Sequence, residues 1–334
     1  PHQESRPMST QRAVRIHQPG GPEALRVDQV DLDEPGPGEV RVRHEAIGVN
    51  FIDAYHRSGL YPVPSLPATI GMEAAGVVEA VGPGVEDLAV GDRVGYATAG
   101  PGAYADTRVL PAAAALALPA ELDARSAAAV MLKGMTVEYL VRRCFPVSPG
   151  MLVVFHAAAG GTGLLACQWL AHLGATTIGV VGSAEKAELA RQHGCHHPVV
   201  RGRDDLVATV RAFSDGRGAA VVYDSVGQAT LDLSLDCLAR RGTLVSFGNA
   251  SGPPRAVDPL ELGRRGSLFL TRPSLMDYTA GRRELEDSAS AVFDAVLRGA
   301  LRPVVGQTHA LDQAAEAHAA LEARRTVGAT LLLP

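Results

Sequence analysis

The segment that most constrains the fold is a glycine-rich stretch between two apolar runs. Residues 153–163 read Val-Val-Phe-His-Ala-Ala-Ala-Gly-Gly-Thr-Gly, and residues 164–173 carry apolar side chains at helical spacing. This order predicts a β-strand, a tight turn and a helix whose first backbone N–H groups point at the turn. Because small residues let an anion approach those groups, the segment is typical of a pyrophosphate-binding turn.

The spacing of the small residues points to a dinucleotide. The usual fingerprint is G-x-G-x-x-G, and this chain has Ala158-x-Gly160-x-x-Gly163, so that the first glycine is replaced. A plain turn between a strand and a helix would also explain the glycines. A second predicted strand, at Ala175 to Val181, favours the βαβ unit that dinucleotides use. We therefore predict that a dinucleotide cofactor binds at Ala158, Gly160, Gly161, Thr162 and Gly163.

The end of the second predicted strand favours NADPH over NADH. NAD sites carry an acidic residue about 20 residues past the glycines, which accepts a hydrogen bond from the ribose 2′-OH. That position holds Val181 here, followed by Gly182, Ser183 and, three residues later, Lys186. An acid would repel a 2′-phosphate, whereas Ser183 and Lys186 can donate to it, each charged hydrogen bond contributing about 1.5–3 kcal/mol. The plainer alternative is a Lys186 that faces water.

The bulk composition is that of an ordinary two-domain enzyme. The chain has 334 residues, of which 46% are hydrophobic and 20% charged, and this length is sufficient for two sizeable cores. The formal net charge is −5 and there is no basic block, so composition gives no support for nucleic-acid binding. No run of 18 apolar residues predicts a membrane span, and no signal peptide is visible. Residues 1–7 are expected to be a non-native remnant ahead of Met8.

The four cysteines are scattered along the chain, at Cys144, Cys167, Cys195 and Cys237. None forms a C-x-x-C pair, so a structural zinc lobe is not expected. Cys167 lies in the apolar helix after the glycine turn and is predicted to belong to the core. A reduced, cytoplasmic protein is the simplest interpretation.

The order of strand and helix signals predicts an α/β protein with two parts. Residues 12–120 hold alternating apolar segments separated by Gly/Pro turns, which is typical of a small, partly closed antiparallel β domain. Residues 126–144 are alanine-rich and helical in period. From residue 151 onward, strands alternate with helices and predict a doubly wound, mostly parallel sheet. Its strands are expected at 151–156, 176–181, 199–200, 220–224, 242–248 and 267–271. From Ser274 the chain is expected to return to helix and short strand, with a candidate final strand at 331–333.

Several longer stretches resemble one enzyme family. They are Gly48-Val-Asn-Phe-Ile-Asp53, Arg57-Ser-Gly-Leu-Tyr-Pro62, Gly91-Asp-Arg-Val94, Leu132-Lys-Gly-Met-Thr136, His156-Ala-Ala-Ala-Gly-Gly-Thr-Gly163, Val222-Tyr-Asp-Ser-Val-Gly227, Val245-Ser-Phe-Gly-Asn249 and Thr271-Arg-Pro-Ser-Leu275. The chain resembles the medium-chain dehydrogenase/reductase superfamily, and within it the zinc-independent NADPH:quinone oxidoreductases, the relatives of zeta-crystallin. This resemblance implies a GroES-like catalytic domain at 8–130 and 275–334. It implies a Rossmann NADPH-binding domain at 131–274.

The resemblance also implies that no metal is bound. Zinc-dependent members of the superfamily carry a cysteine where this chain has Asn50, and Gly-His-Glu where it has Gly71-Met72-Glu73. Both ligand positions are therefore lost. Since Glu73 has no His or Cys partner in this pattern, we expect it to be a structural or solvated carboxylate.

The same likeness places four residues beside the nicotinamide: Asn50, Asp53, Tyr55 and Tyr61. The chemistry agrees, because hydride transfer requires the reacting carbon to be held close to its acceptor and little else from the protein. A quinone needs no metal, since a hydrogen-bond donor or water can neutralise its developing oxygen charge. The two tyrosines can stack on the quinone and donate through their hydroxyls, or they can be packing residues at an interface.

Further residues are implied by resemblance to bind the cofactor: Lys133, Thr136, Ser225, Phe247, Gly248, Asn249, Arg272, Pro273 and Arg324. Residues 247–249 follow a predicted strand at the ligand-bearing edge of the parallel sheet. Lys133 lies in an alanine-rich helix and would otherwise face solvent. For Arg324, the adjacent Arg325 leaves open which of the two arginines matches the cofactor-contacting position of the family. The alternative is that Arg324 is a surface arginine.

Two residues near the predicted nucleotide site have less certain assignments. Close relatives often carry a tyrosine where this chain has Arg201, whose guanidinium can stack on adenine and pair with the 2′-phosphate, or point into water. His156, ahead of the glycine turn, is expected to be a packed or backbone-bonded histidine and not a base.

Three functions remain open on the sequence alone. The first is NADPH-dependent, metal-free reduction of a quinone. The second keeps the cofactor and reduces an α,β-unsaturated aldehyde or ketone. The third is a crystallin-like structural or RNA-binding role, and the acidic net charge argues against RNA. A homodimer is expected as well, because residues 267–271 correspond to an edge strand in relatives and contain no charge or proline to protect that edge.

Overall fold

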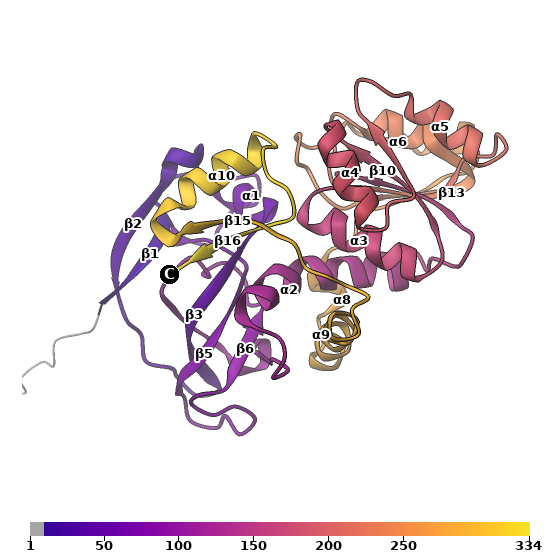
Figure 1. The fold of residues 1–334 in the computed structure, drawn as a ribbon. Helices are drawn as coiled ribbons and strands as arrows, with labels where there is room; N and C mark the ends of the chain where they lie inside the picture. Colours follow the sequence, from indigo (N-terminus) through magenta and orange to yellow (C-terminus); the bar gives the residue numbers. More distant parts are fainter. Residues whose placement is uncertain (1–9) are drawn as a thin grey trace, which may run out of the picture. The chain divides into compact units, whose positions relative to one another are not determined.

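The computed structural model describes residues 10–334, which fall into two compact units. The first unit contains the described residues up to Leu132, with Gln307–Thr326 and Thr330–Pro334; the second contains Lys133–Gly306 and Val327–Ala329. The predicted fold class, a β-rich domain with a doubly wound parallel sheet, is confirmed (Figure 1). The expectation for residues 1–7 lies outside the described part of the chain.

The first unit is built on an antiparallel sheet whose central strand is β3 (Glu39–Val49). Seven strands run in the order β15-β16-β3-β5-β6-β8, with β7 paired to β3, and a smaller sheet has the order β2-β1-β4. Alternate residues of β3 such as Val40 and Val42 are fully buried, as expected for a sheet with one face on the core. The other strands are β1 (Thr10–Ile16), β2 (Leu25–Asp31), β4 (Ala68–Thr69), β5 (Glu73–Val81), β6 (Arg93–Tyr96), β7 (Thr107–Pro111), β8 (Leu116–Ala117), β15 (Val305–Ala310) and β16 (Ala329–Leu333).

Short helices complete the first unit. Two of them carry the polar residues discussed below: α1 (Phe51–Ser58), which directly follows β3, and α10 (Ala314–Glu322), near the C-terminus. Three single turns accompany them, η1 (Pro22–Ala24), η2 (Ala112–Ala114) and η4 (Leu311–Gln313).

The second unit holds a six-stranded parallel sheet in the order β11-β10-β9-β12-β13-β14. The chain leaves β9 toward β10 on one side and returns to β12 on the other, so the strand order reverses at β9. In such sheets ligands bind beyond the carboxyl ends of the strands at the point of reversal. The strands are β9 (Leu152–His156), β10 (Thr176–Val181), β11 (His197–Val200), β12 (Ala219–Asp224), β13 (Leu238–Ser246) and β14 (Phe269–Thr271).

Helices connect these strands, as the alternating pattern predicts. They are α2 (Ala124–Tyr139), which continues into η3 (Leu140–Cys144), then α3 (Gly161–His172), α4 (Ala184–Gln192), α5 (Leu206–Phe213), α6 (Leu231–Cys237), α7 (Pro259–Arg264), α8 (Leu275–Tyr278) and α9 (Arg282–Leu297). The strand predicted at 242–248 begins earlier and ends at Ser246, so residues 247–249 follow it as a loop.

The compact units differ from the predicted domain bounds in residues 131–132, which belong to the first unit, and in residues 275–306 and 327–329, which belong to the second. Within the second unit, Ser288 of α9 donates to Glu138 of α2 at 2.9 Å. The predicted bounds themselves stay a prediction.

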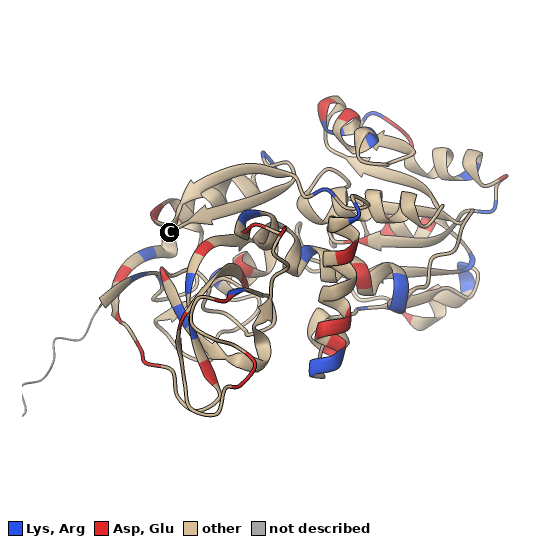
Figure 2. Ribbon diagram, turned by 60° about the horizontal axis from the view of Figure 1, so that its bottom comes forward, with Lys and Arg blue, Asp and Glu red and all other residues tan. Residues whose placement is uncertain are grey.

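Acidic and basic side chains are interspersed along both units, without a basic block in the described residues (Figure 2). Between residues 10 and 334, no helix has the length and apolar character required to cross a membrane.

Candidate functional site

The glycine turn has the strand, turn and helix that its sequence predicts. Gly160 N–H donates to the Ala157 carbonyl at 3.0 Å and closes the turn, and Leu164 N–H makes the first helical bond of α3, to the Gly160 carbonyl at 2.9 Å. The N–H groups of Gly161, Thr162 and Gly163 precede that bond, so they have no acceptor in the helix ladder. They give the turn the donors that an anion requires.

The small residues of the turn are required by close packing. A methyl group on Gly163 would come within 2.2 Å of the Ala157 carbonyl oxygen. Ala158, which replaces the first glycine of the fingerprint, is accommodated by a glycine on the neighbouring strand, because a methyl on Gly179 would lie 2.8 Å from its Cβ. The altered fingerprint therefore keeps the tight geometry that a pyrophosphate needs.

Lys133 lies against the start of α3. Its side chain is buried, and a methyl on Gly161 would come within 2.9 Å of its Cδ. The solvent-facing alternative for this lysine is therefore wrong. A buried lysine beside the N–H groups of the turn fits the pyrophosphate of a dinucleotide. Thr136 follows one turn later on α2 and is 9% exposed.

The predicted 2′-phosphate residues also lie close together. Val181 is buried in a core cluster. Its carbonyl accepts from the N–H of Arg201 at 2.9 Å, so the backbone of Arg201 lies beside the end of β10. A methyl on Gly182 would meet nothing within 4 Å, so the space beyond it is open. Ser183 caps α4 by accepting from the Lys186 N–H at 3.3 Å. Arg201 is exposed. This exposure fits both of its assignments, namely contact with the adenine and 2′-phosphate or a side chain that points into water.

An acidic residue in this group was missed by the sequence reasoning. Glu185 lies between Ser183 and Lys186, and a hydrogen bond from the Ser183 side chain lowers the pKa of its carboxyl. Burial lowers the pKa of the Lys186 ammonium. The signal was present in the sequence, since Glu185 directly precedes Lys186, but only the structure pairs it with the Ser183 hydroxyl.

A second group forms where β12 and β13 end. A methyl on Gly248 would lie 2.4 Å from the Ser225 carbonyl oxygen, so the two loops touch backbone to backbone. Arg272 Nη1 donates to the Gly248 carbonyl at 3.0 Å. In the amide orientation that satisfies both of its groups, Asn249 Oδ1 accepts from Arg272 Nη2 at 3.2 Å. Four of the predicted cofactor residues are thus brought together, with Phe247 and Pro273 beside them in the chain.

His156 is packed, as predicted, but its hydrogen bond goes to a side chain. Its Nε2 lies 3.0 Å from the Ser234 hydroxyl, which donates to Asp224 Oδ2 at 2.7 Å. Burial lowers the pKa of His156, although the charge of Asp224 opposes this. This buried trio joins the ends of β9 and β12 to α6 and does not supply a base.

In the first unit, Asn50 and Asp53 form the start of α1. Asn50 is the N-cap, and its backbone N–H donates to Asp53 Oδ2 at 2.8 Å. Its side-chain amide donates to Glu73 Oε1 at 2.8 Å, and the Leu132 N–H donates to Glu73 Oε2 at 2.7 Å. Glu73 is fully buried. Of the two predicted roles, a structural or a solvated carboxylate, the structural one is therefore correct. A methyl on Gly48 would come within 2.1 Å of the Glu73 side chain.

The two predicted tyrosines contact each other. Their ring centroids lie 5.2 Å apart at 67°, an edge-to-face pair, and Tyr61 N–H donates to the Tyr55 carbonyl at 3.1 Å. His56, which the sequence reasoning did not single out, lies edge-on to Tyr61 with centroids 6.2 Å apart. Its Nδ1 has no hydrogen-bond partner among residues 10–334, and burial lowers its pKa. Asn50, Asp53, Tyr55 and Tyr61 therefore lie in one short segment that begins at the N-cap of α1 and ends just after the helix.

Arg324 follows the end of α10 in the first unit. Its φ of 58° is left-handed, and its N–H donates to the Leu321 carbonyl at 3.0 Å. Its side chain is exposed. The role of Arg324 toward a cofactor stays a prediction.

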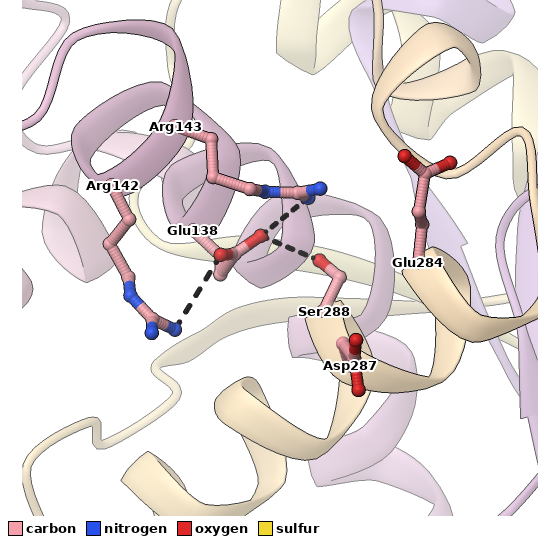
Figure 3. Close-up of a pocket in the computed structure, with 6 residues that line it drawn as sticks. All are labelled: Glu138, Arg142, Arg143, Glu284, Asp287 and Ser288. Atoms are coloured by element: carbon pink, nitrogen blue, oxygen red, sulfur yellow. Dashed lines mark hydrogen bonds and ion pairs between the residues drawn. The ribbon is translucent and has the colours of Figure 1, made fainter.

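A hollow of about 240 Å³ in the second unit is separate from every predicted site residue (Figure 3). Glu138 lies at its centre and accepts from Arg143 Nη2 at 2.7 Å and from the Ser288 hydroxyl at 2.9 Å. Arg142 lies 3.5 Å away on the other carboxylate oxygen. Glu138 is already paired with Arg142 and Arg143. The residues around the hollow therefore form a structural ion-pair cluster between α2, with its continuation η3, and α9.

The zinc-ligand positions hold groups that bond to protein. Met72 is buried, and the Asn50 amide is committed to Glu73. Between residues 10 and 334, no group of three or more His, Cys, Asp or Glu side chains is arranged to hold a metal ion.

Two family profiles match the chain. Residues 36–120 match the alcohol dehydrogenase GroES-like domain, and residues 161–296 match the zinc-binding dehydrogenase domain. The matched ranges correspond to the β-rich unit and to the parallel-sheet unit.

Named relatives cover nearly the whole chain. The quinone oxidoreductase of Pseudomonas aeruginosa is 50% identical over 94% of this chain and 97% of its own length. A 2-haloacrylate reductase from a Burkholderia species is 46% identical over 96% of this chain and 98% of its own. The Escherichia coli quinone oxidoreductase solved in complex with NADPH superposes with a TM-score of 0.95, at 45% identity, over 97% of this chain and 100% of that one.

Proposed function

The chain belongs to the quinone oxidoreductase family of medium-chain dehydrogenases/reductases, and from this premise we propose that it reduces quinones with NADPH and without a metal. When bound, NADPH supplies the hydride. The chain's own task is to bind the cofactor, to hold the quinone in reach and to stabilise the charge that develops on its oxygen.

The observation that carries the proposal is the glycine turn with Lys133 against it. Three backbone N–H groups outside the helix ladder and the buried Lys133 side chain lie at the start of α3, and the neighbouring strand end has a valine in place of an acid. Ser183, Lys186 and Arg201 are the proposed contacts of the 2′-phosphate. A relative at 45% identity has been solved with NADPH, which supports the same cofactor here.

We assign the quinone to the segment on and after α1. The edge-to-face rings of Tyr55 and Tyr61 offer an aromatic surface for a planar acceptor. Their hydroxyls and nearby water are the proposed donors to the quinone oxygen. The residues at the two zinc-ligand positions support metal-free chemistry. The Asn50 amide is hydrogen-bonded to Glu73, and neither an amide nor the Met72 thioether is a good zinc ligand.

A second acceptor class has support of its own. The Burkholderia relative named 2-haloacrylate reductase acts on a carbon–carbon double bond conjugated to a carboxylate, as its name states. Reduction of an α,β-unsaturated carbonyl therefore remains the alternative function for this chain. It would use the same NADPH contacts and differ only in the acceptor.

A steady-state panel tests the proposal. We expect kcat/KM for a benzoquinone or naphthoquinone with NADPH to exceed both the value with NADH and the value for a 2-alkenal, each by roughly tenfold or more. A 2-alkenal that outperforms every quinone would favour the alternative function. A protein that turns over neither class would contradict both.

We further propose that the protein is a cytoplasmic homodimer and binds no nucleic acid. The strand β14 is the last of its sheet, and Phe269 is 62% and Leu270 39% exposed on it. An exposed apolar edge is a template for pairing with a second copy. Light scattering at micromolar concentration is expected to give the mass of a dimer, and Phe269→Glu that of a monomer. Val90→Glu, at another exposed apolar residue, is the matched control and should leave the dimer intact; a wild-type monomer would contradict the assignment.

A further inference from the structure

A chain of hydrogen bonds joins α1 to α10 inside the first unit. Arg57 Nη1 donates to His318 Nδ1 at 3.1 Å, and Arg57 Nη2 donates to Glu322 Oε1 at 2.7 Å. His318 Nε2 lies 2.9 Å from the Tyr104 hydroxyl, which lies 3.0 Å from Asp53 Oδ2. Arg57 is 2% exposed, and His318, Tyr104 and Asp53 are not exposed at all. Only Glu322 reaches the surface.

The direction of each bond follows from which atoms can donate. A guanidinium has no acceptor, so His318 Nδ1 must accept from Arg57, and the proton of the neutral ring lies on Nε2. Burial, reinforced by the charge of Arg57, lowers the pKa of His318 to about 3, so the ring is neutral at pH 7. Nε2–H then donates to the Tyr104 oxygen. The single hydroxyl hydrogen of Tyr104 is left for Asp53 Oδ2.

This chain of bonds does not conduct protons from solvent. A relay would require a group at its outer end that releases a proton and takes up another. Arg57 occupies that place between His318 and the surface, and a guanidinium keeps its protons at any pH a protein survives. These hydrogen bonds therefore keep their protons, and what they can do is hold the side chains of Asp53 and Arg57 in place.

The position that it sets is that of α1. Asp53 and Arg57 are four residues apart and so lie on one face of the helix, while Phe51 and Tyr55 form the same kind of pair about half a turn away. Asp53 Oδ2 also accepts from the backbone N–H of Asn50. Holding Asp53 and Arg57 thus fixes the rotation of α1 about its axis, and with it the N-cap and the opposite face.

We propose that Tyr104 and His318 are positioning residues for quinone reduction, which hold Asp53 and Arg57 and thereby orient Asn50 and Tyr55. The inference rests on the proposed function, which assigns the quinone to the segment on and after α1 that contains Tyr55. Neither Tyr104 nor His318 touches the acceptor in this account. Misplacement of α1 is expected to slow hydride transfer steeply, because the reaction depends on close approach.

The variants Tyr104→Phe and His318→Leu test this on the full chain. Each is expected to lower kcat roughly ten- to hundredfold at saturating NADPH and quinone. The Kd for NADPH should stay at the wild-type value, because the contacts proposed for the pyrophosphate and the 2′-phosphate (Lys133, Ser183, Lys186 and Arg201) lie in the second unit. His318→Gln can still accept from Arg57 and donate to Tyr104, so it should regain most of the lost kcat.

Tyr96→Phe is the matched control. Tyr96 is also fully buried in the first unit, and its hydroxyl lies 2.8 Å from the Nε2 of another histidine, His44. Its variant should lose stability to a similar degree and keep the wild-type kcat. The ¹⁵N shifts of His318 in the wild-type protein provide a measurement that needs no variant, and they should report a neutral ring with the proton on Nε2.

The inference would be overturned by wild-type kcat in both Tyr104→Phe and His318→Leu, by a His318→Gln variant as slow as His318→Leu, or by a His318 ring protonated on Nδ1. An equal loss of kcat in Tyr96→Phe would overturn it as well, because the effect would then be one of general stability. A wild-type chain that oxidises no NADPH with any quinone would refute the proposed function itself. An active wild type with unaffected variants would refute only the positioning role.

Discussion

The side-chain amide of Asn50 donates a hydrogen bond of 2.8 Å to the fully buried carboxylate of Glu73. The second oxygen of Glu73 accepts from the Leu132 N–H. In the zinc-dependent relatives implied by the resemblance, the Asn50 position supplies a metal ligand. Here the same position supplies a hydrogen bond to a buried carboxyl group, which would be costly to leave without partners.

Chelation is therefore expected to leave the enzyme active. After exhaustive dialysis against a strong zinc chelator, kcat and KM for a quinone should equal those of the untreated protein, because Asn50 and Met72 offer no thiolate or imidazole. Metal analysis of the same samples is the companion measurement. One zinc per chain, with activity lost on its removal and regained on its return, would contradict the assignment.

Removal of the charge of Lys186 and removal of the charge of the adjacent Glu185 should change the preference for NADPH in opposite directions. Lys186→Ala removes a proposed donor to the 2′-phosphate, and we expect the ratio of kcat/KM for NADPH over NADH to fall roughly tenfold. Glu185→Gln removes the carboxylate that hydrogen-bonds to Ser183, and the ratio should rise.

Glu188→Gln is the matched control for Glu185→Gln. Glu188 lies on the same helix and is paired with Arg191 on the surface, so its variant should leave the ratio unchanged. Equal kcat/KM for the two cofactors in the wild-type protein would remove the basis of both predictions.

Tyr61 is expected to contribute its ring more than its hydroxyl. Tyr61→Phe should reduce kcat modestly, since water can replace one hydrogen bond worth about 0.5–1.5 kcal/mol. Tyr61→Ala also removes the edge-to-face contact with Tyr55, and misplacement of the acceptor should reduce kcat much further. Steady-state kinetics with one quinone compares the two. A Phe variant as slow as the Ala variant would indicate that Tyr61 donates a proton, as a carbonyl or enone reductase would require.

Acidification should destabilise the protein through two buried histidines. Burial lowers the pKa of His44 to about 4, and burial together with the charge of Arg57 lowers that of His318 to about 3, from 6.5. Each ring is neutral in the folded state, whereas the unfolded chain takes up a proton below pH 6.5. Their contribution to stability is therefore complete above pH 6.5 and is lost as the pH falls toward 4 and 3, by up to about 1.4 kcal/mol per pH unit for each ring.

The midpoint of urea unfolding at pH 7.5, 6 and 5 measures this effect. His44→Leu should make the midpoint less sensitive to pH, although it lowers the midpoint at pH 7.5 by removing the bonds to Tyr96 and Ala105. The same pH sensitivity in the variant and in the wild type would show that His44 is not responsible.

The sequence predicts the parts of this structure that depend on neighbours in the chain. The strand, turn and helix at 152–172 follow from local spacing, and so does the parallel sheet around them. The bonds among Asp53, Tyr104 and His318 join positions far apart in the chain, and no periodicity reports them. Arg57 begins one of the family-like stretches, and an arginine is usually exposed, yet it is the largest of the fully buried side chains.

Quinone reduction by this protein is tested most sharply by the stoichiometry of NADPH oxidation in the presence of a quinone. We predict that absorbance at 340 nm falls only when protein, NADPH and quinone are all present, that one hydroquinone forms for each NADPH consumed, and that deuterium at the transferred position of NADPH slows the reaction. No quinone-dependent loss of NADPH, or a loss seen only with an α,β-unsaturated carbonyl, would contradict the account.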